Sequence, residues 1–395
     1  MADYSKIPSS ATLDVKPFKA HVDDEKLQHF KDLLKLSPIG PATFENTKND
    51  RRYGMKRDWL TDAKKCWENE YDWRKCEDRI NSFPNFKASV KDTEGNTIEV
   101  QFLALFSEKE GAVPIAFFHG WPGSITEFLD LMDILRKRHS PKDLPYHVVV
   151  PSLPGYAYSS GPPQDQDYGI EIATGAMNNL MVGLGFGSGY LAQGGDIGSF
   201  VSRILAVGYD SCKGMHLNMM SLAPPENASE LPVDELEAKA LPRGKEFFDT
   251  GFAYALEHGT RTATIGLALS SSPLALLSWI GEKFLEWTDE DPPLEKILDG
   301  VTLYWMTDTF PRCIYPYRGL QNRTARDNPY VEKPSGYSLF QYELFPVPKS
   351  WAATRCNLVS YAQHEYGGHF AAMERPDVLL ADVEEYIKKA WKPVR

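Results

Sequence analysis

The sequence contains little cysteine: there are five cysteines in 395 residues, and no two of them form a C-x-x-C pair. An odd set without such pairs indicates neither a disulfide framework nor a zinc site. Basic residues are also scarce, with 43 Lys and Arg against 54 Asp and Glu and a formal net charge of −11. Because proteins bind nucleic acid through clustered Lys and Arg, we expect no nucleic-acid partner.

Long uninterrupted apolar segments are missing as well. The longest candidate, residues 264–281, has about the length of a membrane span but includes Pro273 and several serines. It therefore predicts buried helices, and no membrane partner is expected. The first residues have neither the charged start nor the apolar run of a signal peptide, so we expect a cytoplasmic protein.

Short β-rich segments alternate with amphipathic helical segments from about residue 98 to residue 221. This alternation predicts an α/β fold, with helices on both faces of a mostly parallel central sheet. Residues 1–89 are predicted to form a helical extension, and residues 223–335 a helical cap (lid), leaving residues 90–222 and 336–395 as the core. The expected strands are 98–106, 113–118, 147–151, 190–193, 215–220, 337–342 and 357–361.

The strongest local signal surrounds Asp196, between an expected strand and an expected helix. Gly194 and Gly198, two residues before and two after it, suit the sharp turn that presents a nucleophile above the sheet of an α/β-hydrolase. Asp196 then takes the place of the serine of an esterase. The alternative is that Asp196 only caps the following helix.

The second signal is the segment HGWPGS, residues 119–124, directly after the apolar segment 113–118. In an α/β-hydrolase this loop contributes one backbone N–H to an oxyanion hole, here that of Trp121, and the residue after the nucleophile, Ile197, contributes the other. An ordinary Gly/Pro turn after a strand is the alternative.

A catalytic base is expected late in the chain, and His369 lies in the segment GGHF, residues 367–370. A histidine base needs a carboxylate that fixes its tautomer and stabilises its charged form. Glu343 follows an expected strand and is favoured for this task, whereas Glu365, closer to His369 in sequence, is the alternative. The histidine and glutamate at 364–365 do not begin a zinc motif because position 368 is Gly, so no metal is expected.

An aspartate nucleophile favours attack at an sp3 carbon, which forms an alkyl ester that activated water then cleaves. An epoxide leaves as a basic alkoxide and needs a weak acid such as a tyrosine phenol. A halide would instead suit an indole N–H after the nucleophile, where this chain has Ile197. A haloalkane dehalogenase and a non-catalytic binding protein of the same fold are the alternatives.

Together these segments resemble the epoxide hydrolase family, specifically its microsomal-type branch in the soluble fungal form. The resemblance covers nearly the whole chain, including YDWR at 71–74, NSFP at 81–84, FPR at 310–312 and YPYR at 315–318. It implies Asp196 as nucleophile, His369 as base and Glu343 as orienting acid. It further implies that Tyr254 and Tyr317 are cap tyrosines that hold and protonate the epoxide oxygen, with Tyr315 as the rival of Tyr317.

The resemblance also implies the remaining contacts and partners. We expect His119 and Pro122 to contact the substrate and the Trp121–Pro122 peptide bond to be cis, since the family's loop turns sharply there. The expected partners are a small-molecule epoxide and water, with no cofactor, and a homodimer is left open. Tryptophans in the expected cap, among them Trp279, Trp287 and Trp305, suggest a bulky substituent such as an aryl group, and the alternative is that they only pack in the core.

Overall fold

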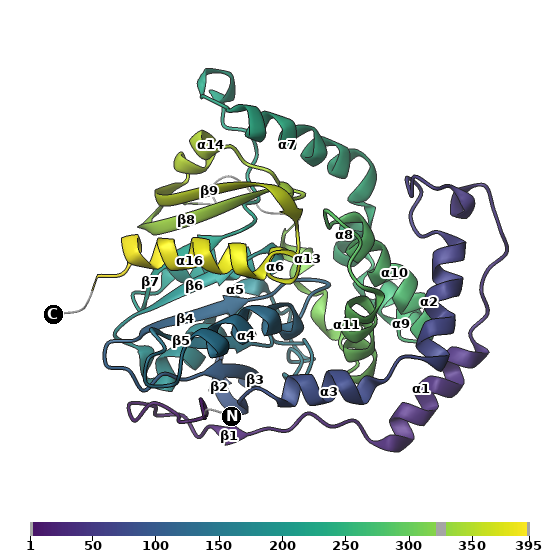
Figure 1. Ribbon diagram of the computed structural model, residues 1–395, viewed down its shortest axis with the longest axis horizontal. Coiled ribbons are helices and arrows are strands. Elements are labelled where there is room, and N and C mark those ends of the chain that lie inside the picture. The colour runs from purple at the N-terminus through teal and green to yellow at the C-terminus, as the bar shows by residue number, and fades with distance from the viewer. Residues whose placement is uncertain (1–2, 321–328, 393–395) are drawn as a thin grey trace.

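Within residues 3–320 and 329–392, which the computed structural model describes, nine strands form one sheet (Figure 1). Their order across the sheet is β1 (Lys16–Pro17), β2 (Asn85–Lys91), β3 (Thr97–Leu105), β5 (Tyr146–Pro151), β4 (Val113–Phe118), β6 (Tyr190–Gly194), β7 (Cys212–Leu217), β8 (Val331–Tyr342) and β9 (Cys356–Gly368). The strands from β5 to β9 pair in parallel, whereas β1, β2 and β3 pair antiparallel with their neighbours. The predicted α/β fold with a mostly parallel sheet is confirmed.

The central strands are covered on both faces, as parallel strands generally are. Every residue of β4 and of β6 is buried. Helices α4 (Leu129–Arg138) and α16 (Pro376–Ala390) pack against each other in front of the sheet, and α5 (Ile170–Met181) and α6 (Asp196–Gly208) lie behind it (Figure 1). In α16 the buried residues recur at helical spacing: Leu379, Leu380, Val383, Tyr386 and Ile387.

Helices follow one another between β7 and β8, as predicted for the cap from the absence of strand texture. They are η4 (Ala228–Glu230), α7 (Glu235–Glu246), η5 (Phe247–Gly251), α8 (Ala253–Thr260), α9 (Thr262–Leu269), α10 (Pro273–Glu286), α11 (Leu294–Met306), α12 (Phe310–Cys313) and α13 (Pro316–Leu320). Most of them lie beside the carboxyl ends of the strands (Figure 1). In the described part of the chain no single helix is long and apolar enough to cross a membrane. Only α9 and α10 taken together have that length and composition, and they bend by 117°.

The N-terminal extension braces this cap. Its helices are α1 (Asp24–Leu36), η1 (Glu45–Thr47), α2 (Arg57–Asn69) and α3 (Trp73–Asn81), of which α1 and α2 contact α10 and α3 contacts α11. The Trp67 indole N–H donates to Thr302 at 3.0 Å, and the Tyr71 hydroxyl donates to Asp299 at 2.7 Å. These hydrogen bonds fix the cap to the extension.

Three strand positions differ from the boundaries predicted for the extension, core and cap. Strands β1 and β2 belong to the sheet although residues 1–89 were assigned to the extension, because β2 pairs with β3 along all seven of its residues, Asn85–Lys91. Strand β8 begins at Val331, inside the predicted cap, because Val331 already pairs with Cys356. Charged residues in and around these three strands make them hard to recognise as strands from the sequence.

Four loops at the carboxyl ends of strands carry the candidate site residues. The chain forms β5 on one side of β4 and β6 on the other, and open α/β sheets bind ligands at such a change of strand order. The HGWPGS loop follows β4, Asp196 follows β6, Glu343 follows β8 and His369 follows β9. The remaining short helices are η2 (Ile125–Phe128), η3 (Val182–Phe186), α14 (Lys349–Ala353) and α15 (Ala371–Glu374).

Candidate active site

Asp196 lies on a strained turn between β6 and α6. Its φ of 45° is in the left-handed region, which residues other than glycine rarely adopt. The turn depends on its flanking glycines, since a Cβ at Gly194 would lie 2.2 Å from the carbonyl oxygen of Gly198. A Cβ at Gly198 would lie 2.0 Å from that of Phe118. Such strain in a non-glycine residue is typical of functional sites and is not needed for a helix cap.

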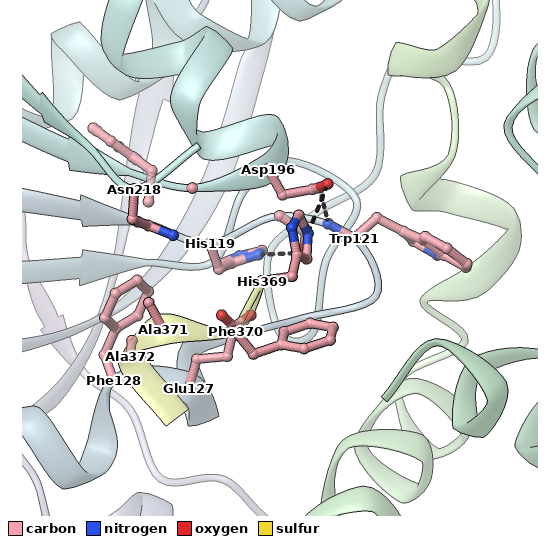
Figure 2. A pocket seen from close by; sticks show the side chains of 13 residues that line it. His119, Trp121, Glu127, Phe128, Asp196, Asn218, His369, Phe370, Ala371 and Ala372 are labelled. Atoms are coloured by element: carbon pink, nitrogen blue, oxygen red, sulfur yellow. Dashed lines mark hydrogen bonds and ion pairs between the residues drawn. The ribbon is translucent and has the colours of Figure 1, made fainter. Parts of the chain in front are cut away.

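The HGWPGS loop contacts the Asp196 carboxylate directly (Figure 2). The backbone N–H of Trp121 donates to Asp196 Oδ1 at 2.7 Å. The Trp121–Pro122 peptide bond is cis, as predicted. Ile197 is buried in the first turn of α6, where backbone N–H groups have no partner within the helix. Of the two N–H groups predicted for an oxyanion hole, that of Trp121 thus contacts the carboxylate, and that of Ile197 stays a prediction.

His369 lies between the carboxylates of Asp196 and Glu343. Its Nε2 is 3.3 Å from Asp196 Oδ2, and its Nδ1 is hydrogen-bonded to Glu343 Oε1 at 2.9 Å. Glu343 is fully buried, whereas its rival Glu365 is exposed. Burial alone would lower the pKa of His369, but the negative charges of Glu343 and Asp196, together with the hydrogen bond from Glu343, outweigh this effect and raise the pKa to about 10. The structure thus brings together the three residues predicted as nucleophile, base and orienting acid.

The loop that carries His369 is held by a residue that the sequence did not single out. Glu374 accepts hydrogen bonds from the backbone N–H groups of Gly368 and Phe370, both at 3.0 Å. The backbone N–H of His369 itself donates to the Trp287 carbonyl of the cap at 2.9 Å. Burial raises the pKa of Glu374 to about 7 against the effect of these N–H donors. A glutamate five residues after a histidine gives no recognisable signal of this arrangement.

Tyr254 of α8 and Tyr317 of α13 meet above the HGWPGS loop. Their ring centroids lie 5.8 Å apart, and the Trp121 ring stacks on Tyr254 at 5.1 Å. Burial raises the pKa of both phenols well above its usual range, and the negative charge of Asp196 adds to this effect. The rival Tyr315 instead packs edge-on against Tyr168, with ring centroids 5.3 Å apart. The structure places Tyr317, and not Tyr315, beside Tyr254.

The contacts of His119 differ from those expected of a residue that binds substrate. Its Nε2 accepts the backbone N–H of Leu153 at 3.1 Å, and its Nδ1 is hydrogen-bonded to the Gly120 carbonyl at 3.2 Å. Burial lowers its pKa to about 4, which keeps the ring neutral. Since both ring nitrogens are engaged by the backbone, His119 positions the loop and has no free polar group for a substrate. Pro122 lines a separate cavity, described below, on the outer side of this loop.

A small cavity of about 20 Å³ lies directly beside Asp196 and His369 (Figure 2). This volume is enough for one water molecule. Backbone and side-chain atoms of several aromatic and small residues form most of its wall, and its ionisable side chains come from His119, Glu127, Asp196 and His369. Glu127 is a second residue that the sequence did not single out.

Comparisons with known proteins show which family the chain resembles. A family model described as the epoxide hydrolase N terminus matches residues 15–128, and one described as the α/β-hydrolase fold matches residues 113–270. The chain is 50% identical to a Dothistroma septosporum protein provisionally named an epoxide hydrolase, over 99% of this chain and 94% of that protein. It is 47% identical to the epoxide hydrolase of Aspergillus niger, whose structure superposes with a TM-score of 0.93 over 99% of this chain and 100% of that one.

A third relative shows the fold alone. The juvenile hormone epoxide hydrolase of the silkworm Bombyx mori is 24% identical, with a TM-score of 0.84 over 97% of this chain and 96% of that one. The two closer relatives match the chain from end to end, including the extension, the core and the cap. The chain belongs to the epoxide hydrolase family and has the α/β-hydrolase fold.

Proposed function

We propose that the chain converts epoxides and water to vicinal diols in two steps, through a covalent ester on Asp196. The observation that carries this proposal is that the two oxygens of the Asp196 carboxylate have different contacts. Oδ1 accepts the Trp121 N–H, whereas Oδ2 faces His369. A carboxylate held through one oxygen can attack with the other, and the held oxygen then becomes the carbonyl oxygen of the ester.

In the first step, Asp196 Oδ2 attacks a ring carbon of the epoxide and the C–O bond of the ring breaks. The oxygen that leaves takes a proton from the phenol of Tyr254 or Tyr317, which becomes a phenolate. Two buried phenols suit this task because they remain protonated at neutral pH and lie together over the loop that holds Asp196.

Ester formation removes the negative charge of Asp196, so the pKa of His369 falls and the ring releases its proton to solvent. In the second step, the neutral His369 takes a proton from water while the water oxygen attacks Cγ of Asp196. The negative charge then develops on Oδ1, where the N–H groups of Trp121 and Ile197 can stabilise it. Glu343 stabilises the charged His369, which gives its proton to the leaving alkoxide of the diol. The proton left on the Asp196 carboxyl group returns to the tyrosine phenolate. As the charge of Asp196 is restored, His369 takes up a proton from solvent, so the enzyme ends in its starting state.

Aryl epoxides are proposed among the substrates. Trp287 is fully buried beside residues that act in both steps of the reaction. The centroid of its ring lies 5.1 Å from that of His369 and 5.2 Å from that of Tyr254. Aromatic rings prefer such edge-on and offset contacts, which an aryl substituent can continue. A cytoplasmic location and a homodimer remain predictions from the sequence.

Styrene oxide in ¹⁸O-labelled water tests the covalent step. In a single turnover with excess enzyme, the oxygen added to the diol should be unlabelled because it comes from Asp196. The label should enter the Asp196 carboxylate, where peptide mass spectrometry can locate it. A diol that is fully labelled in the first turnover would show direct attack by water and contradict the ester. Chloride release from a chloroalkane would favour the dehalogenase alternative.

The pKa of His369 should depend on the charge of Asp196. A negative neighbour favours the imidazolium form, so an Asp196→Asn variant should have a His369 pKa clearly below the value of about 10 that the charged pair sustains. The asparagine imitates the neutral ester, in which His369 must lose its proton to act as a base. NMR titration of the His369 ring measures this change, and Glu365→Gln is the control. An unchanged pKa would mean that esterification does not release the base.

A further inference from the structure

A second cavity, of about 410 Å³, lies on the outer side of the HGWPGS loop. Its wall comes from α3 of the extension, α11 of the cap, and the loop itself from Pro122 to Ser124. Charged side chains line it, including Lys75, Arg79, Lys296 and Asp299. Water can therefore occupy it readily.

Glu127 is the residue that lines both this outer cavity and the small cavity beside Asp196. It belongs to η2, which starts at the end of the HGWPGS loop, and its Oε1 accepts the backbone N–H of Ser124 at 3.1 Å. A Cβ at Gly123 would lie 1.4 Å from Glu127 Oε1, so the loop leaves this space to the carboxyl group. The carboxyl group is thus fixed at the boundary between the two cavities.

The small cavity has the polar groups that a single bound water requires. A buried water usually makes two to four hydrogen bonds, roughly three on average. His369 Nε2 is buried and has no hydrogen-bond partner among the described residues, although Asp196 Oδ2 lies 3.3 Å away as an ion pair. Glu127, His369 and Asp196 all line the cavity (Figure 2). These three side chains come from three different segments of the chain: η2, the start of α6 and the loop after β9.

We propose that the Glu127 carboxyl group binds the water that hydrolyses the ester on Asp196. This inference rests on the covalent mechanism proposed above. The water forms one hydrogen bond with Glu127 Oε2 and gives a proton to His369 Nε2 as its oxygen bonds to Cγ of Asp196. Glu127 itself neither gains nor loses a proton. The outer cavity supplies this water past Glu127, from the outer side of the HGWPGS loop, so the water does not have to pass the ester.

Electrostatic coupling supports the placement of Glu127. Burial raises its pKa to about 8, the positive charge of His369 opposes this rise, and the negative charge of Asp196 adds to it. The pKa of a carboxyl group that only capped a surface turn would not respond to the charges of both His369 and Asp196. Glu127 is therefore close enough to the reacting atoms to affect the second step.

A Glu127→Leu variant tests the proposal in the full-length protein with styrene oxide. Rapid mixing followed by tryptophan fluorescence and acid quench separates ester formation from ester hydrolysis. Since burial keeps the Glu127 carboxyl group mostly protonated at neutral pH, losing its neutral hydrogen bond to the reacting water should slow hydrolysis roughly 10-fold and leave ester formation within about twofold. The ester should then accumulate. Glu295→Leu, which makes the same change on the exposed wall of the outer cavity, should leave both rates unchanged.

A second variant separates water binding from loop structure. Glu127→Gln keeps an acceptor for the Ser124 N–H and a polar group at the water, so its hydrolysis rate should lie between those of the wild type and Glu127→Leu. If Glu127→Leu does not fold, a slower hydrolysis with normal ester formation in Glu127→Gln supports the proposal, and normal hydrolysis overturns it. Equal slowing of both steps, or unchanged hydrolysis in Glu127→Leu, also overturns it. If the wild type forms no ester, the covalent mechanism fails together with this inference.

Discussion

A His369→Gln variant mixed with styrene oxide should accumulate the ester on Asp196 as a stable adduct. The attacking oxygen, Oδ2, and the oxyanion contact from Trp121 are both present without the imidazole, so ester formation should continue. Hydrolysis loses its general base, a contribution of typically 10²–10⁴ in rate. Intact-protein mass spectrometry should show the added mass of one epoxide, and peptide mapping should locate it at Asp196.

An Asp196→Ala variant provides the opposite result, because without the carboxylate no adduct can form under the same conditions. Glu365→Gln is the matched control near His369, since its exposed carboxylate should affect neither step. If His369→Gln shows no adduct with a substrate that the wild type turns over, the base lies elsewhere or water attacks the epoxide directly.

The site residues that could be predicted from the sequence are those whose local backbone requirements leave a pattern. A nucleophile turn needs small residues at fixed offsets, and Gly194 and Gly198 supply them because backbone carbonyls lie within 2.2 Å of where their Cβ atoms would be. The family pattern then located His369, Glu343 and the two tyrosines, which lie far apart in sequence. Only the folded chain shows that they converge at one end of the sheet.

The parts that Glu374 and Glu127 play in the site could not be predicted from the sequence. Glu374 acts by accepting backbone hydrogen bonds, and Glu127 acts through its position between two cavities. Glu374 accepts from the N–H groups on both sides of His369, a geometry that depends on how α15 follows β9. Glu127 resembles an ordinary capping glutamate in sequence, with Ser124 three residues before it. His119 shows the reverse case, where a residue in a functional motif has both ring nitrogens committed to the backbone.

Replacing both Tyr254 and Tyr317 with Phe should almost abolish ring opening. The alkoxide that forms is too basic to leave without a proton, and general acid assistance is worth typically 10²–10⁴ in rate. Each single Phe variant should slow ester formation less than the double variant, because the remaining phenol still donates. Ester hydrolysis should stay unchanged, since it uses His369. The Phe rings preserve the stacking of Tyr254 on Trp121, so the loop that holds Asp196 should keep its conformation.

Pre-steady-state tryptophan fluorescence measures ester formation in the three variants, with Tyr315→Phe as the matched control on the same segment. Tyr315 packs against Tyr168 and away from Tyr254, so its replacement should leave ester formation unchanged. If Tyr315→Phe slows ring opening and Tyr317→Phe does not, the donor is Tyr315. If ester formation is unchanged in the double variant, the phenols do not protonate the epoxide, and the chemical reason for preferring an epoxide over a halide in this site is lost.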